Sequence, residues 1–127
     1  DGTPLYHQAV HFGELKDGLI RGSRFDKTVE REFASFLSDK KDEDIINLCK
    51  SLGGEIIKSK FDLSVVFYLF PNYPVTLNIW FADDEFGAVG SMLVDKSADN
   101  YLTIEDDVVA GEFMLRYIFE RYNELYM

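Results

Sequence analysis

The residues of this chain best suited to chemistry are acidic side chains clustered in its second half. Asp83, Asp84 and Glu85 stand together, Asp95 follows, and Glu105 opens a further acidic group. Carboxylate oxygens ligate divalent metal ions, and a pair of carboxylates can act as general acid and base. The cluster is therefore compatible with a metal-dependent enzyme or a small-ligand-binding protein.

The secondary structure expected around these carboxylates separates them. Residues 75–82 and 88–94 are rich in β-branched and aromatic residues and predict an antiparallel hairpin with 83–87 as its loop. The loop and Asp95 then lie at opposite ends of the hairpin, which leaves Asp95 and Glu105 as the pair for one metal site. The residues after Asp95 lack the glycine and glutamate of an EF-hand, so a solvated acidic edge with helix-capping roles is favoured.

Other residue types give no positive argument for catalysis. His7 and His11 fall in an expected strand, where this spacing places them roughly 13 Å apart, too far for one metal ion. Cys49, the single cysteine, lies in an apolar helical stripe typical of a buried, unreactive thiol. The sequence contains neither a phosphate-binding glycine loop nor a nucleophile-elbow motif. We therefore assign no catalytic residue.

Aromatic residues and prolines near the hairpin are better candidates for binding. Trp80 alternates with the apolar residues of its strand, and we expect a helix to cover it more readily than a ligand or an interface. Pro71 and Pro74 shape the loop before this strand, because proline cannot donate to a strand ladder. The predicted ligand-binding candidates are Pro71, Pro74, Trp80, Asp84, Glu85, Phe86 and Tyr101.

The first half of the chain predicts short strands followed by two helices. Residues 6–12 and 18–23 suggest two short strands or an edge hairpin. A helix is expected from Asp26, with that carboxylate as its N-cap. A second helix at 43–52 would be capped by Asp42 and stopped by the glycine pair that follows it.

The second half predicts a sheet and a last helix. Strands at 55–58 and 63–70 precede the hairpin, and Thr103 would cap a helix at 104–122. We predict a single α+β domain over residues 1–127, with a mostly antiparallel sheet, helices packed on one face and a long C-terminal helix.

Composition and charge limit the function classes. The 127 residues are 46% hydrophobic, which suits a folded core, and their net charge of −10 disfavours nucleic acid and anionic membranes as partners. No apolar run approaches the roughly 20 residues of a membrane span. A lone cysteine excludes an internal disulfide, so we expect a cytoplasmic protein. The start at Asp1 without methionine suggests that residues precede it.

Motifs spread over most of the chain give it a resemblance to the prokaryotic domain of unknown function 3786 family. The motifs that carry the resemblance are Gly22-Ser23-x-Phe25-Asp26, Leu52-Gly53-Gly54, Phe70-Pro71-x-x-Pro74, Trp80, Asp84-Glu85-Phe86, Asp95-x-Ser97 and Tyr101-Leu102-x-x-Glu105-Asp106. The resemblance implies a small cytoplasmic protein of anaerobes, in the context of corrinoid and iron–sulfur metabolism. It supplies no activity, and one cysteine cannot hold an iron–sulfur cluster.

These observations favour a non-catalytic binding or accessory module whose partner is a protein or a small molecule. The first alternative is the metal-dependent enzyme or ligand-binding protein, with Asp95 and Glu105 as metal ligands. The second is a homodimer that buries an exposed aromatic face. No particular cofactor follows from the residues.

Overall fold

The structure is a computed structural model that describes residues 4–127. Its elements in chain order are β1 (Ala9–Val10), the 3-10 turn η1 (Phe12–Glu14), α1 (Arg21–Leu37), α2 (Asp42–Ser51), β2 (Glu55–Ile57), β3 (Leu63–Phe70), β4 (Tyr73–Trp80), β5 (Val89–Asp95), the 3-10 turn η2 (Lys96–Asn100) and α3 (Ile104–Tyr126).

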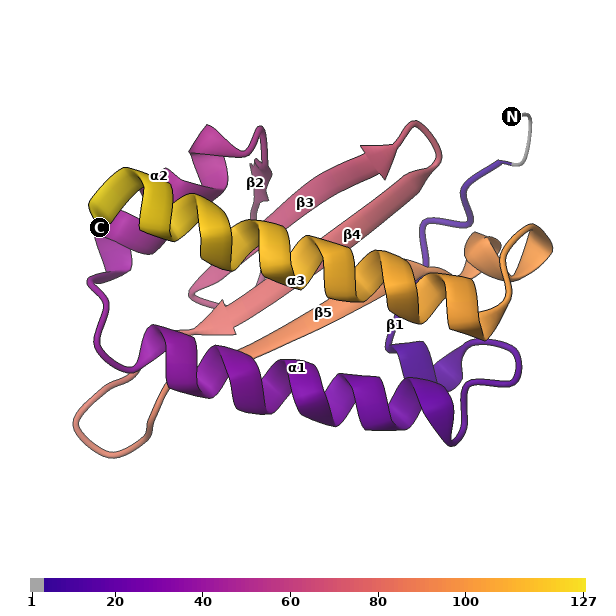
Figure 1. The fold of residues 1–127 in the computed structure, drawn as a ribbon, viewed down its shortest axis with the longest axis horizontal. Helices are drawn as coiled ribbons and strands as arrows, with labels where there is room; N and C mark the ends of the chain where they lie inside the picture. Colours follow the sequence, from indigo (N-terminus) through magenta and orange to yellow (C-terminus); the bar gives the residue numbers. More distant parts are fainter. Residues whose placement is uncertain (1–3) are drawn as a thin grey trace.

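The five strands form one antiparallel sheet in the order β1-β5-β4-β3-β2. Figure 1 shows α1 and α3 side by side across one face of this sheet, with α2 near the end of α3. Within residues 4–127 no helix lies on the opposite face, which we call the outer face. The predicted α+β architecture, with helices on one face and a long final helix, is confirmed.

Alternation along the strands builds the core between the sheet and the helices. In β4 the side chains of Tyr73, Val75, Leu77 and Ile79 are buried, and the residues between them point to the outer face. Successive strand side chains point to opposite faces, so a single helical layer buries only every second residue. Apolar residues recurring along α1, such as Phe33, pack against this buried row.

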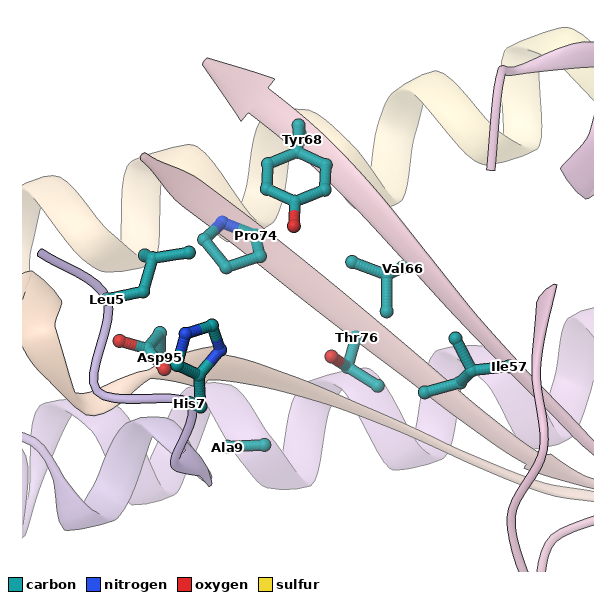
Figure 2. Close-up of a pocket in the computed structure, with 9 residues that line it drawn as sticks. All are labelled: Leu5, His7, Ala9, Ile57, Val66, Tyr68, Pro74, Thr76 and Asp95. Carbon is teal, nitrogen blue, oxygen red and sulfur yellow. The ribbon is translucent and has the colours of Figure 1, made fainter. Parts of the chain in front are cut away.

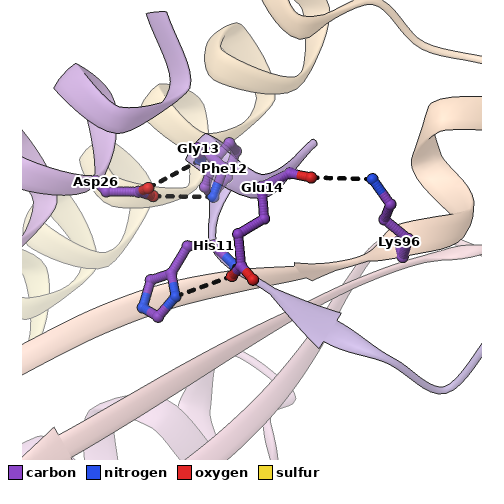
Figure 3. Close-up of polar contacts among 6 residues, drawn as sticks. All are labelled: His11, Phe12, Gly13, Glu14, Asp26 and Lys96. Atoms are coloured by element: carbon purple, nitrogen blue, oxygen red, sulfur yellow. Dashed lines mark hydrogen bonds and ion pairs between the residues drawn. The ribbon is translucent and has the colours of Figure 1, made fainter. Parts of the chain in front are cut away.

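The N-terminal segment differs from the expected hairpin. Residues 18–23 do not form a strand, because α1 already begins at Arg21, and Asp26 lies inside the helix instead of capping it. Its carboxylate accepts hydrogen bonds from the backbone N–H groups of Phe12 (3.0 Å) and Gly13 (2.9 Å), as Figure 3 shows. An acidic residue before an apolar helix is the usual N-cap pattern. Here the carboxylate oxygens of Asp26 instead accept hydrogen bonds from the backbone of η1.

Side chains also hold the other end of η1. Lys96 donates to the backbone oxygen of Glu14 at 2.9 Å, and the carboxylate of Glu14 accepts from the backbone N–H of His11 at 2.8 Å. That amide lowers the pKa of Glu14. η1 is thus fixed to α1 through Asp26 and to the start of η2 through Lys96.

The remaining elements lie where the sequence predicted them, with shifted ends. β4 begins at Tyr73 instead of residue 75, so Pro74 pairs with Tyr68 inside the strand and does not shape the preceding loop, and α3 continues to Tyr126 instead of residue 122.

Thr103 caps α3 by accepting from the N–H of Asp106, as predicted, and Gly53 takes a positive φ of 78° after α2. The N-cap of α2 is Lys41, one residue before the expected Asp42. The predicted burial of Cys49 is confirmed, and burial raises the pKa of its thiol to about 12, which disfavours the reactive thiolate.

Gly22 is required where α1 crosses η1. A Cβ atom at this position would overlap the carbonyl group of Phe12, which is backbone and cannot rotate away. We expect Gly22→Ala to lower the free energy of unfolding by about 2 kcal/mol in urea denaturation, the usual scale of overpacking. Gly87→Ala is the control, because a Cβ atom on Gly87 would meet no other atom within 4 Å, and it should leave stability unchanged. Equal stability of the two variants would contradict the close approach.

Candidate functional site

The helices leave the outer face of the sheet open. Register and alternation place these residues on it: Ser64, Val66 and Tyr68 from β3; Pro74, Thr76, Asn78 and Trp80 from β4; Val89, Ser91, Leu93 and Asp95 from β5. β3, β4 and β5, which are described throughout, carry no lysine, arginine or glutamate on this face, and Glu55 of the edge strand β2 shares it beside Val66. A solvated face of an antiparallel sheet is ordinarily polar.

A hollow of about 250 Å³ lies on this face (Figure 2). Its floor comes from β3 and β4, the N-terminal segment forms one wall, and Ile57 of β2 forms the other. The lining residues are Leu5, His7, Ala9, Ile57, Val66, Tyr68, Pro74, Thr76 and Asp95. Two of the residues predicted from sequence, Pro74 and Asp95, are therefore brought to one place.

Asp95 holds the wall of the hollow in position. Its carboxylate accepts from the backbone N–H groups of Tyr6 and Gln8, both at 2.9 Å, and from the N–H and hydroxyl of Ser97. Burial alone would raise the pKa of Asp95, but these hydrogen bonds outweigh it and the net pKa lies below its ordinary value. The carboxylate predicted as a metal ligand is thus engaged by the chain itself.

His7 stands between the two amides that Asp95 binds. Its φ of 56° lies in the left-handed region, which is uncommon for residues other than glycine and often marks a functional site. Figure 2 shows its imidazole beside Asp95 at the wall of the hollow. The sequence analysis considered His7 only as half of a metal pair with His11, and it set that pair aside because the strand expected there would hold the two rings too far apart. The other half, His11, lies at the start of η1 with its ring 3.3 Å from the carboxylate of Glu14.

Removing the Asp95 carboxylate should release this wall. We expect Asp95→Ala to lower the free energy of unfolding by about 2 to 4 kcal/mol, because several backbone donors lose a charged acceptor. Amide hydrogen exchange at Tyr6 and Gln8 should accelerate more than exchange in β4.

Asp84→Ala provides the control for this substitution, since Asp84 is exposed in the β4–β5 loop. It should change neither the free energy of unfolding nor the exchange rates. Unaltered exchange at Tyr6 and Gln8 in Asp95→Ala would refute the anchoring role.

The second metal candidate, Glu105, lies elsewhere. It is exposed at the start of α3, and one of its oxygens is 4.0 Å from Nε of Arg21. Among residues 4–127 no group of three or more histidine, cysteine, aspartate or glutamate side chains is placed to hold a metal ion. The acidic residues identified in the sequence therefore do not converge on one centre in this part of the chain.

The acidic loop between β4 and β5 is organised by Asp83. Its carboxylate accepts from the N–H groups of Phe86 and Glu85, both at 2.8 Å, and these bonds lower its pKa. Asp84, Glu85 and Phe86 are exposed in this loop, at the end of β5 opposite Asp95. They lie apart from the hollow, as the hairpin geometry predicted.

Trp80 is on the outer face, so the expectation that a helix covers it is wrong. Its side chain is 41% exposed and its ring centroid lies 5.2 Å from that of Phe61. The hydroxyl of Ser64 forms hydrogen bonds of 2.6 Å with the hydroxyl of Ser59 and with the side-chain oxygen of Asn78. These polar residues lie between Trp80 and the hollow. The outer face therefore has an aromatic end, a polar middle and the apolar hollow.

The remaining candidates shape turns. Pro71 begins the turn between β3 and β4, and the hydroxyl of Tyr101 donates to the backbone oxygen of Asn72 in that turn at 2.8 Å. This bond ties the segment before α3 to the hairpin. Neither residue lines the hollow.

Asp107 is the ionisable residue whose burial the sequence interpretation missed. It is fully buried, accepts a 2.8 Å hydrogen bond from the hydroxyl of Tyr73, and its Oδ2 has no hydrogen-bond partner within residues 4–127. Burial, reinforced by the charges of Asp99 and Asp106, raises its pKa to about 6 despite the bond from Tyr73. Its position three residues after Ile104 and four before Gly111, both buried, was the available signal, because this spacing marks the inner face of a helix.

The raised pKa makes the stability depend on pH. Between the ordinary value of 3.8 and about 6 the folded chain binds a proton at Asp107 that the unfolded chain does not. The free energy of unfolding should therefore rise as pH falls from 7 to 4, with Asp107 contributing on the order of 2 to 3 kcal/mol.

Urea denaturation of Asp107→Asn across this range measures that contribution. The asparagine amide does not titrate, so the free energy of unfolding should depend less on pH in the variant than in the wild type. The other carboxylates affect both proteins equally, and their effect cancels when the two profiles are subtracted. Parallel pH profiles for the two proteins would show that Asp107 titrates normally.

Comparison with known proteins identifies the family of the chain. A family model described as Domain of unknown function (DUF3786) matches residues 1–117. The chain belongs to this family, as its motifs indicated. No curated protein and no solved structure matches it. Within residues 4–127 no helix has both the length and the apolarity needed to cross a bilayer.

Proposed function

We propose that this chain is a non-catalytic protein-binding module that uses the outer face of its sheet. The observation that carries the proposal is the central part of the outer face, on β3, β4 and β5: half-exposed apolar and aromatic side chains whose one charged group, Asp95, is engaged by the chain itself, with Glu55 at the β2 edge, on a chain of net charge −10. Such exposed apolar surfaces on soluble domains commonly mark interaction sites. Charge depletion with aromatic enrichment is characteristic of the centre of protein interfaces.

The size of the hollow favours a protein side chain over a small molecule. Ligand pockets usually measure roughly 300–1,000 Å³, whereas this hollow measures about 250 Å³ and is open to solvent. A bulky apolar side chain of a partner would fill it, with Tyr68 and Ile57 at its margins. A corrinoid ring is far larger than this space, so any association with corrinoid metabolism would run through protein contact.

The polar groups of the hollow support binding more than chemistry. An imidazole that acts as a general base is usually oriented and activated by a carboxylate beside it. Asp95 is instead bound by two backbone amides and Ser97, which leaves His7 and Thr76 to orient a partner. These two residues can supply hydrogen bonds around an apolar contact.

The proposed setting is the cytoplasm of an anaerobic prokaryote, beside corrinoid or iron–sulfur proteins. This setting rests on the family resemblance. The acidic surface around this largely apolar face would favour partners with basic residues outside the apolar contact.

The test is a peptide selection on the immobilised chain. A display library of random peptides should yield sequences with a bulky apolar residue that bind with a Kd in the micromolar range by fluorescence polarisation. Thr76→Arg, which fills the hollow with a charged side chain, should weaken binding about tenfold or more. Thr28→Arg on α1 is the control at an equally half-buried position and should bind normally.

The outcomes separate the alternatives. Peptides that bind Thr76→Arg as tightly as the wild type, or an unproductive selection, would overturn the proposal. If light scattering shows that the wild type is a dimer and Thr76→Arg a monomer, the partner of the outer face is a second copy of the chain and not a different protein. If the chain binds the selected peptides but no purified corrinoid or iron–sulfur protein, the proposed metabolic setting is wrong and the protein-binding function stands.

A further inference from the structure

We propose that a groove between α3 and the β3–β4 turn binds an amphipathic helix with basic flanks from a partner protein. The groove lies on the helical side of the sheet and is independent of the outer face. Its lining residues are Leu69, Phe70, Leu102, Asp106, Val109, Ala110 and Phe113.

The exposed side chains of this groove form a helical stripe. Val109, Phe113 and Tyr117 recur at every fourth position of α3, and Val109 and Phe113 are 60% and 63% exposed. The rings of Phe113 and Tyr117 lie 6.4 Å apart between centroids. Residues four apart lie on one face of a helix, and α3 already buries a different face in the core. The helix is therefore apolar on two faces, of which its own fold uses one.

The helical layer leaves room for a further helix at this place. Figure 1 shows the β3–β4 turn projecting beyond α3 on the side away from α1, while α2 lies near the other end of α3. Phe70 in this uncovered part is exposed and stacks on Tyr73, with ring centroids 4.9 Å apart. A helix beside α3, at the usual 8–10 Å interaxial distance, would cover both Phe70 and the stripe.

The charges beside the stripe select the partner. Residues 103–117, which span the stripe, contain Glu105, Asp106, Asp107 and Glu112 against one basic residue, Arg116. Glu105, Asp106 and Glu112 are exposed, and Asp106 lines the groove. The excess of negative charge opposes a second copy of this chain, because two such stripes would bring like charges together. Lysine or arginine beside the apolar face of a partner helix would complement it.

The experiment uses a synthetic peptide of about 20 residues designed as an amphipathic helix, with leucines on one face and lysines along both flanks. Fluorescence polarisation measures its binding to the full chain, and circular dichroism follows its helicity. We expect saturable binding that weakens as NaCl rises from about 50 to 500 mM. Phe113→Glu should weaken binding about tenfold or more.

Phe86→Glu is the matched control, because Phe86 is similarly exposed but lies in the β4–β5 loop. It should bind the peptide as the wild type does, and both variants should retain the wild-type unfolding midpoint, since neither side chain is in the core. A second peptide with glutamates in place of lysines should not bind.

Three results would overturn the inference. The first is equal binding of the lysine and glutamate peptides, and the second is unchanged binding by Phe113→Glu. The third is a wild-type dimer that Phe113→Glu dissociates, which would make a second copy the occupant. The variants Thr76→Arg and Phe113→Glu also separate the two surfaces, because each should affect the ligand of only one.

Discussion

The packing of Phe12 between α1 and α3 is the contact on which the rest of the structure depends. Its backbone carbonyl lies against Gly22, its ring meets Phe25 at 4.7 Å between centroids, and the same ring approaches Gly111 of α3. The backbone N–H of Phe12 is held by Asp26. One residue thereby fixes the distance between the two long helices and the place where the chain enters the sheet.

The candidate site follows from this entry point. β1 pairs with the end of β5, so Ala9 lies opposite Asp95, and the carboxylate of Asp95 reaches back to the segment before β1. The wall of the hollow, with His7 in its left-handed conformation, is set by backbone hydrogen bonds from both sides. The site consequently depends on polar contacts between segments almost ninety residues apart in the chain.

The fold also explains why both proposed surfaces remain apolar. Two helices can cover one face of a twisted sheet, so the alternate residues of β3, β4 and β5 stay uncovered. On the covered side, α3 crosses the sheet obliquely and leaves the β3–β4 turn beyond its edge. Both surfaces are therefore consequences of a helical layer smaller than the sheet it packs on.

The sequence by itself determined the elements whose signals are local: the four longer strand segments, Gly53 after α2, Thr103 before α3, the buried thiol of Cys49 and the membership of the family. Periodicity and capping act over a few neighbouring residues, which is why they can be interpreted without a fold. Tertiary structure decided which carboxylates are engaged, since Asp26 and Asp95 bind amides far away in the chain. It also decided that Trp80 is uncovered and Asp107 buried, because alternation identifies two faces of an element but only packing selects which of them meets another layer.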